Sequence, residues 1–280
     1  MNKIVHRLNG KFRKPLVALL VAGVTAGLFF LIGFAQINQN EKRCREIFVK
    51  IDSDYDNYFV DKNMVMKIIT NDGKNPVIGK FKKEIPVTQI EKMLKKNPFV
   101  DKAEVFCDLN GNMNVTVSQK KPIARILTGS GTSYYLDEKG DLLPLSQKYT
   151  ARVLVISGKQ ADLEVRKFLE NKRKKMAVQH PLKPIADSSV FSGPVMELIQ
   201  FIISDKFWNM QIAQINIHNF SNVDLIPVVG DQVIQLGEPI EIQKKFQYLM
   251  AFYRQAMTET GWNLYSSISL KFKNQIVCRK

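Results

Sequence analysis

The sequence is poor in the residues from which most enzyme sites are built. It has three cysteines and three histidines in 280 residues, and neither type forms a cluster. This excludes a disulfide framework and any familiar spacing of metal ligands. There is also no glycine-rich phosphate loop beside a strand and no Gly-x-Ser-x-Gly turn. Because acid–base catalysis needs paired titratable groups, we predict a binding protein that is not an enzyme, with no catalytic, cofactor-binding or metal-binding residues and no cofactor.

Carboxylates are also scarce. The chain has 41 Lys and Arg against 26 Asp and Glu, a formal charge of +15. Inside a cell such a charge would suggest nucleic acid as the partner. The topology argued below places most of the chain outside, so we expect no nucleic acid. Anionic lipid, acidic wall polymer, an acidic protein partner and a basic surface without a dedicated ligand all stay open.

One long apolar run lies near the start of the chain, at residues 15–37. From Leu16 to Ala35 it has no charged residue, and Thr25 is its one polar residue. About 20 helical residues rising about 1.5 Å each cover a hydrocarbon core about 30 Å thick. We therefore predict a transmembrane helix. Gly33-Phe34-Ala35 resembles a signal-peptide cleavage site, but a signal-peptide core has only about 7–15 apolar residues, so an uncleaved anchor is favoured.

The charges beside this run predict its orientation. Residues 1–14 contain lysine and arginine but no carboxylate, whereas residues 38–46 carry both signs. Positive flanks stay in the cytoplasm. We expect a single-pass protein of the inner (plasma) membrane, with a basic cytoplasmic tail at 1–14, a connector at 38–46 and the bulk of the chain extracytoplasmic (periplasmic).

Two folded domains are expected after the connector, α+β overall. For residues 47–120 the patterns predict a strand, two helices, a second strand, a hairpin turn at Asn110-Gly111 and a third strand. Asp61 is expected to cap the first helix. For residues 121–280 we predict a mainly antiparallel β domain with a long helix from Glu238 to about Glu259. Strands are expected at 211–218, 223–228 and 232–236, and a final hairpin at 264–272 and 275–279.

Four short sequence segments accompany this order of strands and helices. They are Asn97-Pro98-Phe99-Val100 before the hairpin, Lys121-Pro122-Ile123-Ala124-Arg125 after it, the segment from Tyr135 to Pro144, and the ending from Ser269 to Arg279. Together with the single span and basic tail, they resemble the FtsQ/DivIB cell-division family, in which a POTRA domain precedes a β domain. One departure is that Ser269-Leu270-Lys271 stands where the family often has Asp-Leu-Arg, which leaves the charge of any contact there open.

The resemblance implies a scaffold of the bacterial divisome at the division septum. Such a protein binds FtsB-like and FtsL-like coiled-coil membrane proteins and other divisome proteins outside the membrane, and helps to control septal peptidoglycan synthesis. By position, it implies a contact strip in the last strands with two neighbours on the long helix. An incoming strand would add to the free sheet edge there. For the apolar members, core packing is the alternative. The implied residues are Lys271, Phe272, Gln275, Ile276, Val277, Cys278, Tyr248 and Tyr253.

Three functions other than a division scaffold make different demands on the sequence. A membrane-anchored extracytoplasmic adaptor would bind lipid or cell-wall glycan through the basic surface, with strongly salt-dependent binding. An outer-membrane assembly protein would need a long series of amphipathic strands of about 10 residues each after the first domain, and these are missing. An anchored wall enzyme would need a nucleophile or a metal set.

Overall fold

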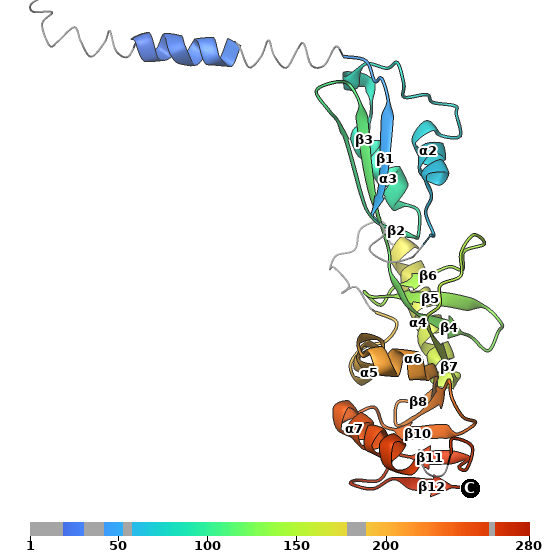
Figure 1. The fold of residues 1–280 in the computed structure, drawn as a ribbon. Helices are drawn as coiled ribbons and strands as arrows, with labels where there is room; N and C mark the ends of the chain where they lie inside the picture. Colours follow the sequence, from blue (N-terminus) through green and yellow to red (C-terminus); the bar gives the residue numbers. More distant parts are fainter. Residues whose placement is uncertain (1–18, 31–41, 53–57, 178–188, 258–260) are drawn as a thin grey trace, which may run out of the picture. The chain divides into compact units, whose positions relative to one another are not determined.

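The computed structural model describes residues 19–30, 42–52, 58–177, 189–257 and 261–280 (Figure 1). They fall into two compact units, one of residues 1–52 and 60–118 and one of residues 53–59 and 119–280. Residues 19–30 are helical. The rest of the predicted span and the whole basic tail lie outside the described residues. Within the described ranges, no helix has both the length and the apolar character that crossing a membrane requires.

The first unit contains a three-stranded sheet with two helices on one face. The sheet has the order β1-β3-β2, and β1 runs parallel to β3. The first helix begins where the sequence predicts, since the Asp61 carboxylate accepts the Met64 backbone N–H at 2.6 Å. It ends at Asn71, whose φ of 50° is left-handed. The elements are β1 (Ile47–Asp52), α2 (Lys62–Thr70), η1 (Lys82–Glu84), α3 (Val87–Lys95), β2 (Val100–Cys107) and β3 (Met113–Gln119).

Alternation of buried and exposed side chains explains this layering. Along β3, Met113, Val115 and Val117 are buried, while the residues between them are partly exposed. Val65 and Ile69 of α2 and Ile90 and Leu94 of α3 form the buried stripes of the helices. Period-two strands and period-3.6 helices present these side chains to one shared core.

The second unit is built on a nine-stranded sheet of order β12-β11-β10-β9-β8-β7-β4-β5-β6. Among the described residues, three of its eight pairings are parallel, namely β4 with β7, β7 with β8, and β10 with β11. The other five are antiparallel, so the sheet is mixed with the predicted antiparallel majority. The strands are β4 (Pro122–Leu127), β5 (Ser133–Asp137), β6 (Leu142–Leu143), β7 (Leu154–Ser157), β8 (Ile212–Asn219), β9 (Asn222–Pro227), β10 (Val233–Gly237), β11 (Ser267–Ser269) and β12 (Val277–Arg279).

Helices supply the other half of this unit's core. Val165 of α4, Leu198 of α5, Trp208 of α6 and Phe246 of α7 are all buried in one cluster with the inward side chains of the sheet. Parallel pairings need long crossovers, and the α4–α6 region between β7 and β8 provides one. The helices are α4 (Lys159–Ala177), α5 (Pro194–Ser204), α6 (Lys206–Gln211) and α7 (Ile242–Phe252), the last followed by the π-helical turn η2 (Tyr253–Met257).

Two expectations at the end of the chain are corrected. The long helix begins at Ile242, not Glu238, because Glu241 has a left-handed φ of 49° just before it. The last two strands are much shorter than predicted, and residues 270–276 form a connecting loop. Leu270 still donates its N–H to the Gln235 carbonyl of β10, and beyond it the loop leaves the sheet and is bonded to α7 through Asn274 and Tyr248.

Candidate partner-binding site

The last strand, β12, forms one edge of the nine-stranded sheet (Figure 1). It pairs with β11 in antiparallel register, with Ser267 opposite Arg279 and Ile268 opposite Cys278. No other strand in the described part of the chain pairs with it. An edge strand presents backbone N–H and C=O groups that another chain can pair with.

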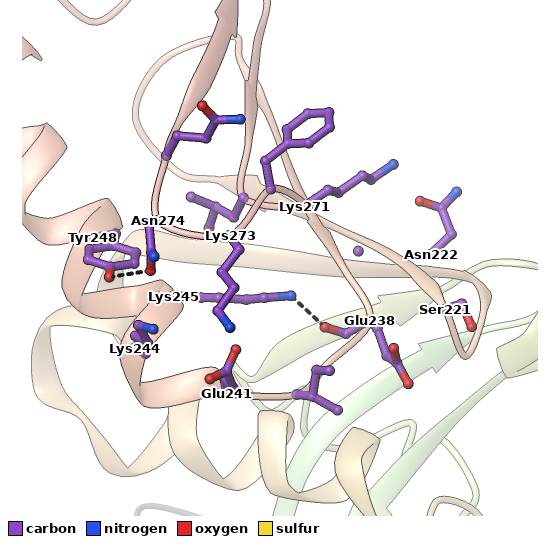
Figure 2. Close-up of a pocket in the computed structure, with 15 residues that line it drawn as sticks. Ser221, Asn222, Glu238, Glu241, Lys244, Lys245, Tyr248, Lys271, Lys273 and Asn274 are labelled. Atoms are coloured by element: carbon purple, nitrogen blue, oxygen red, sulfur yellow. Dashed lines mark hydrogen bonds between the residues drawn. The ribbon is translucent and has the colours of Figure 1, made fainter.

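A groove of about 560 Å³ lies at the loop that leads into this strand (Figure 2). Three segments that are distant in the sequence line it. They are the turn between β8 and β9 at Ser221 and Asn222, the segment from Gly237 through the first turns of α7, and residues 270–275 before β12. The lining ends at Gln275, so the groove lies at the end of the sheet, next to the start of β12.

Hydrogen bonds fix the walls of the groove. The Tyr248 hydroxyl of α7 donates to the Asn274 side-chain oxygen at 3.2 Å, which ties the helix to the loop before β12 (Figure 2). The Lys245 ammonium donates to the carbonyl oxygens of Leu236 at 2.8 Å and Glu238 at 2.7 Å. Burial lowers the pKa of Lys245, although the charges of Glu238 and Glu241 oppose this shift. Lys245 thus braces the wall, so its ammonium is not free in the groove.

A close backbone approach shapes the groove at Gly237. Its φ is 73°, and a Cβ there would lie 2.9 Å from Cγ of Lys271. Only glycine meets both conditions without strain, so β10 can end directly against the loop. Asn274 also has a positive φ, of 60°. Asparagine is among the few residues that tolerate this region.

The lining is mainly basic. Lys244, Lys271 and Lys273 surround the groove together with the bracing Lys245, against the two carboxylates Glu238 and Glu241. The Lys244 ammonium lies 5.9 Å from the centroid of the Tyr248 ring. Positive potential in a groove attracts and orients segments of opposite charge.

The structure brings together half of the residues implied by the resemblance. Tyr248, Lys271, Phe272 and Gln275 all line the groove, and the Phe272 side chain is 51% exposed. Val277, in β12 itself, is 45% exposed. The four groove residues and Val277 are all exposed or partly exposed.

The other three lie further inside. Ile276 and Cys278 are half-buried and pack against the core of the unit, and burial raises the pKa of the Cys278 thiol. Tyr253 is only 4% exposed, with its ring 5.0 Å from that of Trp262 and 6.0 Å from that of Trp208. In this conformation Tyr253 packs in the core of the second unit at the end of α7 and does not line the groove.

Several lining residues had no signal in the sequence. Ser221 and Asn222 reach the groove because β10 pairs with β9 on one side and with β11 on the other, which local patterns do not reveal. Lys244 and Glu241 fall within the helix predicted from Glu238 to about Glu259, and the sequence marks them only as polar residues of that helix. A charge pattern over the start of that helix could have suggested a contact surface, but not the loop that faces it.

Comparison with known families agrees with this architecture. A family model described as "FtsQ/DivIB, C-terminal related" matches residues 121–279, and a model of the POTRA-like domain matches residues 42–118. No curated protein matched the sequence in a direct comparison. The first model covers more than half of the chain.

The chain belongs to the FtsQ/DivIB family. Its role is therefore in cell division, among other division proteins at the division site, and its family is one of non-enzymatic scaffolds. The fold is α+β, with a POTRA-like domain and a mixed-sheet domain.

Proposed function

We propose that this protein is a single-pass membrane scaffold of the divisome that captures an extended segment of an FtsB-like or FtsL-like partner along β12. Capture outside the membrane would link the protein to the assembly that controls septal peptidoglycan synthesis. The observation that supports this proposal is that, within the described residues, the outer side of β12 is unpaired and the loop that leads into it lines a basic groove. The proposal includes no catalytic activity.

The proposed contact surface consists of the eight residues that the resemblance to the FtsQ/DivIB family implies. Phe272 and Val277 would supply apolar contacts, Lys271 and Gln275 polar ones, and Tyr248 the wall on α7. Ile276, Cys278 and Tyr253 would hold these groups in place from the core side. Strand addition derives affinity from backbone hydrogen bonds and specificity from side-chain pockets.

The domain plan proposed with it keeps the boundaries expected from the sequence. Residues 1–14 would be the cytoplasmic tail, 15–37 the inner-membrane span, 38–46 the connector, 47–120 the POTRA-like domain and 121–280 the β domain. What supports the span is the run of apolar residues flanked by positive charge on one side.

The test uses the full-length protein in detergent, and the extracytoplasmic segment of each candidate partner as a labelled probe. Val277→Asp places a carboxylate on the exposed face of β12, where a paired strand would desolvate it. We expect the dissociation constant to rise at least about tenfold, since truncation or burial of a central contact costs about 1.4 kcal/mol or more. Leu163→Asp on α4 is the matched control, because both side chains are 45% exposed.

The result decides between sites. If Val277→Asp binds as tightly as the unchanged chain while Leu163→Asp does too, the partner does not use β12. If both variants lose binding equally, the contact depends on general surface charge, and strand addition is wrong. If neither an FtsB-like nor an FtsL-like segment binds the unchanged, folded chain, the partner assignment fails.

A further inference from the structure

The start of the first unit is held between two turns. Arg43 forms an isolated antiparallel bridge with Phe81, and the Lys82 N–H donates to the Lys42 carbonyl at 2.9 Å. On the other side, Arg45 donates its N–H to the Gly111 carbonyl at 3.0 Å. Gly111 has a φ of 90°, and a Cβ there would lie 2.6 Å from the Arg43 oxygen. The chain therefore enters the domain through a tightly packed end.

This end is rich in positive charge. The cations of two of its segments, residues 42–45 and 80–83, are exposed or partly exposed, and within the part of the chain that the structure describes none of them forms a salt bridge. We call them the basic end. They are Lys42, Arg43, Arg45, Lys80, Lys82 and Lys83.

Carboxylates nearby do little to neutralise the basic end. Glu84 accepts the Phe81 backbone N–H at 3.3 Å. Asp108 accepts the N–H groups of Asn110 and Asn112, both at 2.8 Å, and these bonds lower its pKa. Glu46 is the one other carboxylate in these segments. The local excess of cations is therefore three.

Two of the cations are held in position over an aromatic ring. The Arg43 guanidinium carbon lies 4.2 Å from the centroid of the Phe81 ring and one of its nitrogens donates to the Gly79 carbonyl at 2.9 Å. The Lys83 ammonium lies 5.5 Å from the same ring. In the segments that hold the start of the unit, Ile78 is 57% exposed, and Leu109, whose carbonyl accepts from the Lys42 ammonium, is 61% exposed. Ordered cations beside exposed apolar side chains suit a surface where phosphate meets hydrocarbon.

The sequence brings this end close to the membrane if the proposed anchor is right. The apolar run ends at Ile37, and only five residues later Lys42 is already part of the domain. Five residues span at most about 18 Å. Basic clusters this close to a span are attracted by anionic headgroups.

We propose that the basic end of the first unit docks on anionic phospholipid headgroups at the membrane surface. This inference rests on the proposed anchor for its proximity argument. Docking would fix the orientation of the first unit relative to the bilayer and hold it near the surface.

The test is hydrogen exchange of the full-length protein in discs of phosphatidylcholine alone or of an equal mixture with phosphatidylglycerol. The anionic lipid is expected to slow exchange in residues 78–84 and 109–111, and salt at about 1 M, where the Debye length is about 3 Å, should abolish the effect. The triple variant Lys80→Gln, Lys82→Gln and Lys83→Gln should lose the protection. Each cation contributes about fivefold to surface association, so the three together contribute about 100-fold.

The triple variant Lys172→Gln, Arg173→Gln and Lys174→Gln on α4 removes the same charge elsewhere and should retain the protection. Equal exchange in the two lipids, or equal loss in both variants, overturns the inference. Extraction of the unchanged protein by alkaline carbonate reports separately on the anchor. If the protein is released, the anchor fails, and exchange with added vesicles of the same two compositions still decides whether the basic end binds anionic lipid.

Discussion

The two edges of the nine-stranded sheet are built in opposite ways. The β6 edge has two residues, Leu142 and Leu143, which are 8% and 1% exposed. The β12 edge has three residues, its Val277 is 45% exposed, and the loop that leads into it lines a basic groove. Proteins shorten and cover the edges that must stay unpaired. The β6 edge is therefore buried, whereas the β12 edge exposes a large apolar side chain, as the proposed capture of a partner along β12 requires.

An ion pair reinforces the closed edge. The Lys120 ammonium lies 3.1 Å from a carboxylate oxygen of Asp137 and 2.9 Å from one of Asp141. Asp137 also accepts the backbone N–H groups of Lys139 and Asp141 in the turn before β6. Near β12, the described residues show neutral side-chain hydrogen bonds instead, from Tyr248 to the Asn274 side chain and from Ser266 to the Arg279 carbonyl, both at 3.2 Å.

The largest expected effect is a difference in the free energy of unfolding between one substitution in β6 and one in β12. Leu143→Asp buries a carboxylate without a partner and should lower the free energy of unfolding of the second unit by about 4 kcal/mol. Val277→Asp leaves its carboxylate in water and should cost less than about 1 kcal/mol. Both tryptophans, Trp208 and Trp262, lie in the second unit, so denaturation followed by their fluorescence reports on it. Equal losses in the two variants would mean that the edges are packed alike.

The next effect concerns the ion pair. Burial disfavours the charge on Lys120, but the hydrogen bonds and charges of Asp141 and Asp137 outweigh it, so the pKa of Lys120 is raised. Lys120→Met leaves Asp137 buried without its cation and should cost about 2 kcal/mol.

The pH dependence of this pair has a definite sign. A lysine pKa raised by folding gives stability that is complete below the unfolded pKa of about 10.5 and is lost as the pH rises through the folded value. The unchanged chain should therefore lose stability relative to Lys120→Met only above about pH 10.5. The same difference at pH 7 and at pH 11.5 would show that the ion pair does not contribute.

A smaller effect is expected on the affinity of the protein for its partner when a residue near β12 is changed. Phe272→Ala removes an exposed ring beside the groove and should weaken partner binding about tenfold, with little change in stability. Leu145→Ala follows the closed edge, where the side chain is 42% exposed, and should leave binding unchanged. Titration of the labelled partner segment against each full-length variant measures both. Weaker binding by Leu145→Ala would place the contact at the wrong edge for this proposal.

Local signals in the sequence predicted much of this fold. The capping residue Asp61, the turn residues Asn110 and Gly111 and the alternation along β3 each act within a few residues, and the structure has each feature at the expected place. The strands at 211–218, 223–228 and 232–236 were also placed to within about two residues. Such features depend on backbone conformation and side-chain period, which neighbouring residues determine.

The candidate site was predicted only in part because its parts come from distant segments. The parallel pairing of Val233 with Ser267 joins strands separated by the whole of α7, and it brings the β8–β9 turn toward the loop before β12. The left-handed Glu241 delays the helix and opens the groove beside it, and no local preference predicts that conformation for glutamate. Tertiary packing decides both.

Tyr253 is expected to show the smallest effect at neutral pH, and it tests which residues belong to the open edge. Burial raises its pKa to about 12, although the side chains of Gln211 and Gln232 oppose the shift. Because the folded state favours the neutral phenol, its contribution is complete below about pH 10 and is lost as the pH rises toward 12. Tyr253→Phe should therefore change partner affinity by less than twofold and reduce the loss of stability above pH 10, by up to about 3 kcal/mol at the highest pH.

Tyr248→Phe is the matched control, because it removes the bond to Asn274 but retains Tyr253. It should preserve the alkaline loss of stability and weaken the partner complex, since the loop before β12 is then held less firmly against α7. Fluorescence-monitored unfolding from pH 8 to pH 12, with partner titrations at pH 7.5, gives both readouts. Loss of affinity in Tyr253→Phe with none in Tyr248→Phe would place the buried ring in the contact, and the open edge would then have to extend beneath α7.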